Sequence, residues 1–394
     1  MELKTLAESA GADVEATVSQ RLKAPDPRTF IGKGKTAEVR EISQASEATV
    51  VIFDDALSPA QARNLENELK LRVIDRSQLI LDIFAQRART LEGKLQVEIA
   101  QLSYLQPRLT RQWSHLSRVR GGGAGGAGGV GTRGPGETQL EVDRRRLRER
   151  LSRLRVRLKD VERTRGIQRR RRLEVPYPTV ALVGYTNSGK STLLNVLTGA
   201  EVEAANRPFS TLDPTIRRLK LPNRMTVMLA DTVGFIHRLP HMLVDAFKAT
   251  LEEVRTADLL LHVVDASSPL APERMEIVDG VLEEIGAGTT PRIIVMNKID
   301  LIENPPRPPG EIVAISALRE KGLDHLLAAI GRRLGASREE IVVTLAAGRG
   351  DLVAMARRDG EVLSEEYRDG VVSMRARVSA PVAGRLRKAA LAQA

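Results

Sequence analysis

Residues 180–197 read VALVGYTNSGKSTLLNVL, and few stretches of this length restrict a fold so strongly. The stretch contains the pattern G-x-x-x-x-G-K-[ST] between an apolar strand and an apolar helix. Glycines let backbone N–H groups close around a phosphate, and the dipole at a helix N-terminus favours negative charge there. We therefore predict a phosphate-binding loop in an α/β domain with a mostly parallel sheet.

Each residue type of this loop has an expected task. The predicted phosphate-binding residues are Gly184, Tyr185, Thr186, Asn187, Ser188, Gly189, Lys190 and Ser191. The Lys190 ammonium would reach the terminal phosphates, and the Ser191 hydroxyl would bind Mg²⁺. The alternative is a glycine-rich turn that binds nothing, and the strand–loop–helix context argues against it.

Two downstream segments are expected to complete the phosphate site. The first consists of Phe209, Ser210, Thr211, Leu212 and Asp213. It lacks apolar periodicity, which suits a mobile loop that brings the Thr211 hydroxyl to Mg²⁺ as a second protein ligand beside Ser191. The second consists of Asp231, Thr232, Val233 and Gly234, where an apolar strand ends. The Gly234 N–H would face the γ-phosphate, so we expect Lys190, Thr211 and Gly234 to serve the chemistry.

A third motif names the base. It consists of Asn297, Lys298, Ile299 and Asp300, at the end of the apolar strand RIIVMN. A carboxylate at Asp300 can accept hydrogen bonds from N1–H and the exocyclic amine of guanine, whereas adenine presents an acceptor at N1. The backbone of Ser316, Ala317 and Leu318 can meet guanine O6. The order of these motifs predicts GTP and GDP as the bound nucleotides.

The residue after Gly234 bears on the rate of hydrolysis. Many GTPases place a glutamine there to orient the attacking water, whereas this chain has Phe235, which cannot form that hydrogen bond. We therefore expect slow intrinsic hydrolysis that a partner accelerates. His237 is a candidate water-positioning group, although a lone histidine beside such a loop is more often incidental.

The charge of the chain points to a polyanionic partner. The net charge is +11, and residues 141–172 hold 15 Lys and Arg against five Asp and Glu. Such a concentration is typical of phosphate contact, and the low aromatic content of 3% favours folded RNA over stacking on single-stranded bases. A solvated charged helix is the alternative.

Composition excludes several other classes of function. The chain has no cysteine, which rules out disulfides, thiolate metal sites and thiol catalysis. No apolar run approaches the ~20 residues of a membrane span, so we expect a cytoplasmic protein, and a monomer.

At 394 residues the chain is expected to hold several units. We predict an N-terminal α/β domain over 1–85 and a basic helical hairpin over 86–173 with a glycine-rich loop at 121–136. A GTPase domain over 174–336 and a small C-terminal α/β domain over 337–394 complete the chain.

Local patterns give these units their expected elements. In the first domain, strands are expected at 48–55 and 71–77, around a helix at 58–70 that Ser58 caps. Helical periodicity is expected from about Leu79 to Arg118 and again from Leu140 to Val161. In the last domain, a helix near 350–358 should precede two strands joined at Asp369 and Gly370.

Together these motifs resemble the HflX family of ribosome-binding GTPases. The resemblance is carried by FDDALSPAQARNLE (53–66), VIDRSQLILDIFAQRARTLEGKLQVEIAQL (73–102), GPGETQLEVDRR (134–145), GYTNSGKSTLLN (184–195), FSTLDPT (209–215) and DTVGFI (231–236). It implies binding to the large ribosomal subunit and its RNA, with the hairpin directed toward the catalytic centre of that subunit. It also implies GTP-dependent splitting of stalled or idle ribosomes under stress.

Two other functions stay open at this point. One is an ATP-dependent RNA-remodelling protein that uses the N-terminal domain, for which Gly32, Lys33, Gly34 and Lys35 are the only support. An ordinary turn is the better explanation of that segment. The other is a ribosome-occupying or assembly factor in which the nucleotide is regulatory and hydrolysis is not needed.

Overall fold

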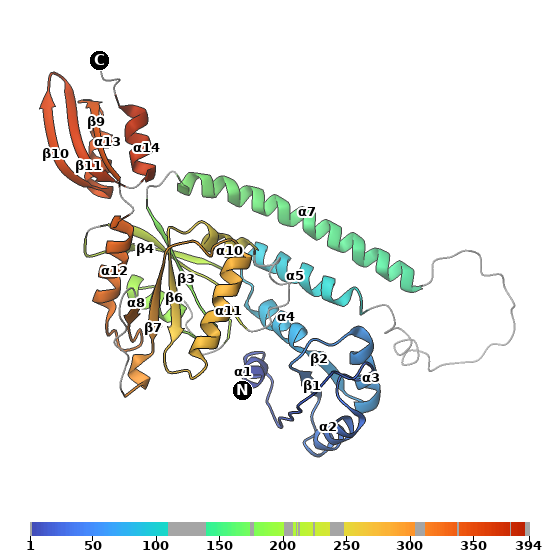
Figure 1. The fold of residues 1–394 in the computed structure, drawn as a ribbon. Helices are drawn as coiled ribbons and strands as arrows, with labels where there is room; N and C mark the ends of the chain where they lie inside the picture. The colour runs from blue at the N-terminus through green and yellow to red at the C-terminus, as the bar shows by residue number, and fades with distance from the viewer. Residues whose placement is uncertain are drawn as a thin grey trace. The chain divides into compact units, whose positions relative to one another are not determined.

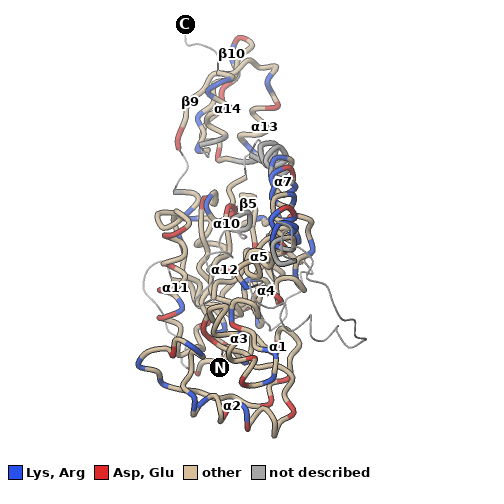
Figure 2. Tube along the Cα trace, turned by 90° about the vertical axis from the view of Figure 1, so that its right-hand side faces the viewer, with Lys and Arg blue, Asp and Glu red and all other residues tan. Residues whose placement is uncertain are grey.

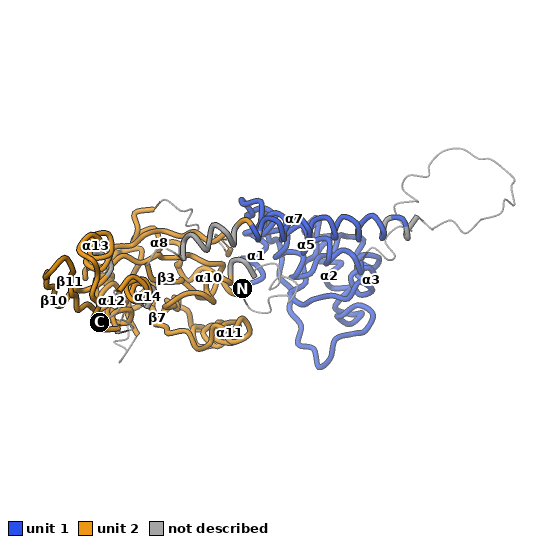
Figure 3. Tube along the Cα trace, turned by 90° about the horizontal axis from the view of Figure 1, so that it is seen from above, with its two compact units in different colours: residues 1–163, 239–247 blue, residues 164–238, 248–394 orange. Residues whose placement is uncertain are grey.

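A computed structural model describes the chain in segments that leave some residues out. The described residues are 2–108, 139–173, 177–200, 208–209, 211, 213–223, 225–236, 248–303, 312–336, 339–378 and 380–390. The chain forms two compact units, which Figure 3 shows in different colours. Unit 1 holds 1–163 and 239–247, and unit 2 holds 164–238 and 248–394.

Unit 1 begins with a small α/β fold (Figure 1). Its first elements are α1 (Glu2–Ser9), α2 (Lys33–Ala45), β1 (Val50–Phe53), α3 (Pro59–Leu69) and β2 (Arg72–Asp75). The two strands pair in parallel, as a strand–helix–strand unit requires. The Ser58 hydroxyl accepts a hydrogen bond from the Gln61 N–H, and Oε1 of Gln61 accepts one from the Ser58 N–H. The expected helix with its Ser58 cap is confirmed.

Two helices follow where one continuous periodicity was expected. They are α4 (Arg76–Arg87) and α5 (Leu91–Leu105). The Thr90 hydroxyl accepts a hydrogen bond from the Gly93 N–H and so starts a new helix. The expectation of a strand as far as 77 is also wrong, because Asp75 caps α4 and ends β2. Residues 109–118 lie outside the described part.

The second helix of the expected hairpin is α7 (Gln139–Leu173), which is longer than its apolar pattern. Leu151 and Leu154 are buried, as the heptad-like spacing of leucines predicts. The Glu98 carboxylate of α5 pairs with the Arg150 guanidinium of α7, at 2.5 Å between Oε1 and Nη2. The glycine-rich loop at 121–136 lies outside the described residues.

Unit 2 is organised around a six-stranded sheet in the order β4-β5-β3-β6-β7-β8. Its strands are β3 (Thr179–Val183), β4 (Thr215–Lys220), β5 (Thr226–Asp231), β6 (Leu259–Asp265), β7 (Arg292–Asn297) and β8 (Ile312–Ala314). All pairings are parallel except that between β4 and β5. The central strands are apolar along their length because helices cover both faces.

The helices of this domain form two layers. They are α8 (Lys190–Thr198), α10 (Lys248–Arg255), α11 (Ala271–Glu284) and α12 (Leu323–Ala336), with the short 3₁₀ helix η1 (Ile299–Leu301). Leucines and isoleucines of α8 and α12 share one buried cluster with alternate residues of the sheet. Helices α10 and α11 cover the other face (Figure 1).

The end of the chain folds as a small sheet backed by helices. Its elements are β9 (Glu339–Ala346), α13 (Gly350–Asp359), β10 (Glu361–Arg368), β11 (Val371–Val378) and α14 (Ala380–Ala389). The strands are antiparallel in the order β10-β11-β9, and the helix and two strands expected here are confirmed. Strand β9 and helix α14 were not expected from the sequence.

The predicted fold class is therefore confirmed: a mostly parallel α/β domain with further small α/β and helical units. None of the helices in the described part of the chain is long and apolar enough to cross a membrane.

Candidate functional site

The phosphate loop lies between β3 and α8, as predicted. Gly184 has φ 149°, and a Cβ there would stand 2.2 Å from the Val263 carbonyl oxygen. Gly189 has φ 96°, and a Cβ there would stand 2.3 Å from Nδ2 of Asn297. Only glycine fits both positions, since each combines a left-handed backbone with a close neighbour. The two glycines of the motif are thus required by geometry before any nucleotide is considered.

Lys190 is folded back onto this loop. Its ammonium donates to the carbonyl oxygens of Gly184 and Tyr185, at 3.0 and 2.9 Å. Burial lowers the pKa of Lys190 to about 8, and the nearby Asp231 carboxylate opposes that shift. The ammonium therefore lies within the phosphate loop, and its pKa of about 8 is well below the ordinary lysine value.

This pKa predicts how nucleotide affinity depends on pH. Phosphate binding needs the ammonium form, which the free protein loses as pH rises above about 8. We expect GDP affinity to stay level below pH 8 and to fall by up to about tenfold per unit above it. Titrating a fluorescent GDP from about pH 6.5 to about pH 9 measures this.

Lys190→Arg is the control for that titration, because a guanidinium keeps its proton over this range. The variant shares any titration of guanine itself, so its affinity should change less above pH 8 than that of the natural chain. Equal pH profiles for the two proteins would contradict the role given to the ammonium.

Three predicted residues from separate segments meet at one carboxylate. Oδ2 of Asp231 accepts hydrogen bonds from the hydroxyls of Ser191 and Thr211, at 2.7 and 2.8 Å. The two hydroxyl oxygens are 2.8 Å apart. All three side chains are buried, and burial raises the pKa of Asp231 while Lys190 and the two hydroxyls lower it. The phosphate loop, the segment that holds Thr211 and the end of β5 are thus joined.

These donors fit Mg²⁺. Octahedral Mg²⁺ holds oxygens at about 2.1 Å, which places neighbouring ligands about 3.0 Å apart. The hydroxyls of Ser191 and Thr211 have nearly that spacing at 2.8 Å. Oδ1 of Asp231 is buried without a hydrogen-bond partner among the described residues, so it could accept a bond from metal-bound water. When bound, the ion would neutralise charge on the nucleotide phosphates.

The segment from Asp231 to Gly234 lies against the phosphate loop. A Cβ on Gly234 would stand 2.9 Å from Cα of Thr186 and 3.0 Å from Nζ of Lys190. Phe235 donates its N–H to the Gly184 carbonyl at 3.0 Å and accepts from the Thr186 N–H at 2.7 Å. Its ring is 2% exposed. The side chain that follows Gly234 is therefore buried and does not face a water molecule.

Introducing a glutamine in place of Phe235 should not raise the intrinsic rate of GTP hydrolysis. We expect Phe235→Gln to leave the intrinsic GTP hydrolysis rate within about twofold, and to destabilise the domain by about 3 kcal/mol because an amide replaces a buried ring. Single-turnover hydrolysis without ribosomes and thermal unfolding with GDP measure the two effects. Phe235→Leu is the apolar control, and a tenfold faster Phe235→Gln would refute the account.

The base motif is built around Asn297. Its Nδ2 donates to the Ser188 carbonyl at 2.9 Å, and its Oδ1 accepts from the Ala317 N–H at 3.0 Å. The residue thereby ties the phosphate loop to the segment from Ser316 to Leu318. Asp300 lies in η1 and is exposed, so its carboxylate is accessible to a base.

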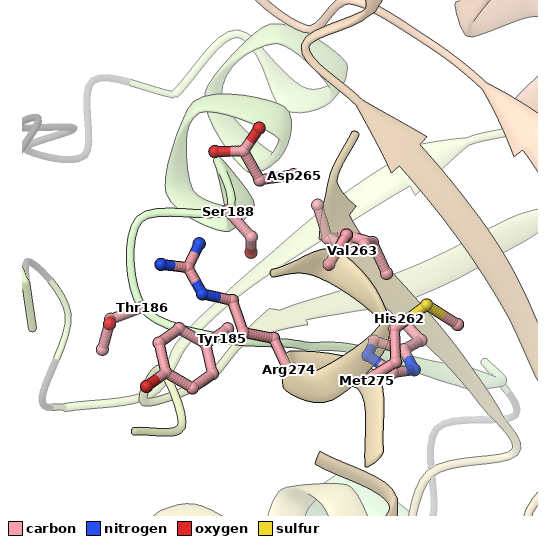
Figure 4. A pocket seen from close by; sticks show the side chains of 10 residues that line it. Tyr185, Thr186, Ser188, His262, Val263, Asp265, Arg274 and Met275 are labelled. Carbon is pink, nitrogen blue, oxygen red and sulfur yellow. The ribbon is translucent and has the colours of Figure 1, made fainter. Parts of the chain in front are cut away.

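The structure adds neighbours that the motifs do not name. The Lys298 ammonium pairs with Asp265 at the end of β6, at 2.7 Å. The Arg274 guanidinium of α11 lies over the Tyr185 ring, 4.8 Å from its centroid (Figure 4). It also donates to the Ser268 hydroxyl. Tyr185, Asp265 and Arg274 line a small pocket beside the phosphate loop. No sequence motif signalled Asp265 or Arg274, because each is distant in sequence from the motif residue that it contacts.

Some predicted residues lie outside the described part. These are Ser210, Leu212 and His237, whose roles stay predictions. Phe209 is buried and has φ 57°. Asp213 follows Thr211 closely in the chain, and Thr232 and Val233 lie between Asp231 and Gly234.

A phosphate loop on a parallel sheet with these following motifs defines the class of P-loop GTPases, and comparison with known proteins agrees. Residues 179–298 match the family described as 50S ribosome-binding GTPase. Residues 1–85 and 87–172 match the N-terminal and middle regions of the family described as GTP-binding GTPase. The chain belongs to the HflX family of GTPases, and the predicted resemblance is confirmed.

Individual relatives support this membership. The GTPase HflX of Caldanaerobacter subterraneus subsp. tengcongensis is 47% identical over 386 residues, which cover 98% of this chain and 89% of that protein. The GTPase HflX of Escherichia coli is 54% identical over 303 residues, which cover 77% of this chain and 70% of that protein. That of Magnetococcus marinus is 46% identical over 376 residues, covering 94% and 85%. The protein is accordingly a nucleotide-binding GTP hydrolase.

Proposed function

We propose that this GTPase binds the large ribosomal subunit and its RNA, and separates stalled or idle ribosomes into subunits in a GTP-dependent way. The observation that carries the proposal is the shared carboxylate of Asp231, which holds Ser191 and Thr211 together. A γ-phosphate with Mg²⁺ would favour this joined state, and the loss of that phosphate on hydrolysis would release the segments that hold Thr211 and Asp231. The match to a family described as 50S ribosome-binding GTPase supports the choice of partner.

We further propose the residue roles within this cycle. Gly184 to Ser191 hold the phosphates, Phe209 to Asp213 and Asp231 to Gly234 form the two switches, and Asn297 to Asp300 with Ser316 to Leu318 hold guanine. Mg²⁺ binds the hydroxyls of Ser191 and Thr211. The four parts 1–85, 86–173, 174–336 and 337–394 act as separate functional domains.

Sedimentation of intact ribosomes tests the proposal. With the protein present, GTP and a non-hydrolysable analogue should both yield separated subunits, and GDP should not, since binding of the GTP form drives the split. Lys190→Ala is the control, because it removes the phosphate contact. Equal splitting or equal ribosome affinity in the GDP and GTP forms would refute the coupling.

The other candidate functions remain distinguishable. A ribosome-occupying or assembly factor without a need for hydrolysis would keep normal ribosome binding and release in Lys190→Ala. For the ATP-dependent alternative, the segment from Gly32 to Lys35 forms the start of α2, and Lys35 pairs with Glu38 at 2.7 Å. These contacts describe an ordinary helix start. A variant with Lys33→Ala and Lys35→Ala that kept all ATP-linked activity would exclude that alternative.

A further inference from the structure

Helix α7 carries two separate rows of basic side chains. At 3.6 residues per turn, each residue is turned about 100° from the last. Row A consists of Arg144, Arg148, Arg155 and Lys159. Row B consists of Arg146, Arg150, Arg153 and Arg157. The apolar seam consists of Leu147, Leu151, Leu154 and Leu158, and the rows lie roughly 90° to either side of it.

Both rows are available to a ligand. All their members are exposed except Arg144, which is half-buried. In Figure 2 the basic positions follow one another along the described part of α7. Arg150 pairs with Glu98, whereas Arg148, Arg155 and Arg157 form no ion pair among the described residues. Most of this charge is therefore not neutralised within the described part of the chain.

The face opposite the seam differs from both rows. It consists of Arg145, Glu149, Ser152, Val156, Asp160 and Arg163, which we call the strip. Its two basic and two acidic members cancel, and Arg145 lies 3.9 Å from Glu149. Its centre holds the short side chains Ser152 and Val156, and Val156 is 59% exposed. The helix thus presents a narrow neutral band between two lines of positive charge.

We propose that α7 lies along the minor groove of an RNA duplex, with row A on the phosphates of one strand and row B on those of the other. A helix is about 10–12 Å across with its side chains, and the minor groove of A-form RNA is wide and shallow. The strip would face the groove floor, where Val156 contacts sugars and the Ser152 hydroxyl reaches 2′-hydroxyls. This inference rests on the proposed function, because it names the RNA form that this helix would recognise.

The arrangement argues against a single strand. One strand needs a single line of positive charge and aromatic side chains for stacking, and neither row nor strip contains an aromatic residue. Two lines on opposite sides of a neutral band match two phosphate backbones instead. The short centre of the strip allows close approach, which a longer or charged side chain would prevent.

Anisotropy measurements with the full chain test the proposal. The probes are a labelled RNA hairpin with a stem of about 16 base pairs, an unpaired strand of equal length, and a DNA duplex of the same sequence. We expect the RNA duplex to bind at least about tenfold more tightly than either other probe. Neutralising three residues of one row should lower the slope of log affinity against log salt by about 2 to 3, for either row.

The variants have matched controls. The row A variant combines Arg148→Gln, Arg155→Gln and Lys159→Gln, and the row B variant combines Arg146→Gln, Arg153→Gln and Arg157→Gln. The control removes the same charge from unit 2, as Arg217→Gln, Lys220→Gln and Arg332→Gln. Val156→Glu should weaken duplex binding at least tenfold more than Val342→Glu, which places the same charge at a similarly exposed valine of β9.

Several results would overturn the inference. One is a loss of salt dependence that only one of the two row variants shows, and another is a single strand or a DNA duplex that binds as tightly as the RNA duplex. Full displacement of the RNA duplex by polyglutamate, or equal effects of Val156→Glu and Val342→Glu on duplex binding, would also contradict it. If ribosomes still bound in a GTP-dependent way, the proposed function would survive such results. If ribosomes failed to bind while the RNA duplex did, the proposed function would fail alone.

Discussion

Replacing Asp300 with asparagine should lower the affinity for GTP and GDP by about 10³-fold and admit xanthosine nucleotides. The aspartate carboxylate is exposed in η1, and at the proposed base site it would accept from both N–H groups of guanine. An asparagine would turn an N–H₂ toward the guanine amine, so one hydrogen bond becomes a repulsive contact. Sites built to hydrogen-bond a substrate reject mismatched analogues by about 10⁴–10⁵-fold at best, so the expected loss is well within reach.

Titrations with GDP and with xanthosine diphosphate measure this switch. The control is Asp324→Asn, which removes an exposed acid in the first turn of α12 and should leave both affinities within about twofold. A variant Asp300→Asn that held GDP within tenfold of the natural chain would show that another residue reads the base.

The elements around the site were predictable because each has a local cause. Strands β5 and β7 were expected to end at Asp231 and Asn297, and they do. A buried parallel strand is an uninterrupted apolar run, and the polar residue that follows marks where it reaches the sheet edge. Parallel strands end at the same edge of a sheet, so motifs that each follow a strand could be predicted to lie close together.

Contacts between distant elements were not predictable in this way. The pairing of Lys298 with Asp265 depends on the register of β6 and β7, and the stacking of Arg274 on Tyr185 depends on how α11 packs. Neither residue type nor spacing reveals such partners. The same holds for Thr211, whose segment suited a mobile loop but whose hydroxyl is buried against Asp231.

The predicted end of a strand was wrong where one residue is compatible with both a strand and a helix cap. The sequence around Asp75 reads as a strand and as a helix cap, and the cap prevailed because its carboxylate accepts from the Gln78 N–H at 2.9 Å. The same carboxylate also meets Arg108, more than thirty residues away. This second contact could not be predicted from the sequence. We expect its removal to have the largest effect on the stability of unit 1.

Arg108→Met should destabilise the fold around β2 by about 3–5 kcal/mol, because it leaves a buried carboxylate without its cation. Asp75 is 1% exposed, and its Oδ2 lies 2.9 Å from Nη2 of Arg108 and 3.1 Å from the Leu57 N–H. The guanidinium also donates to the Leu57 carbonyl and lies 3.5 Å above the centroid of the Tyr104 ring. Methionine keeps much of the apolar packing on that ring and removes the charge.

Hydrogen exchange at the amides of β2 and α4 measures the loss, since a chain with several units need not unfold in one step. Arg40→Met, at an exposed position of α2, should leave these amides within about 0.5 kcal/mol. Adding Asp75→Asn to Arg108→Met should restore at least about 1 kcal/mol, because the asparagine keeps an acceptor for Gln78 without a buried charge. If the double variant were as unstable as the sum of its parts, the ion pair would not be what holds the end of α5 to the strand.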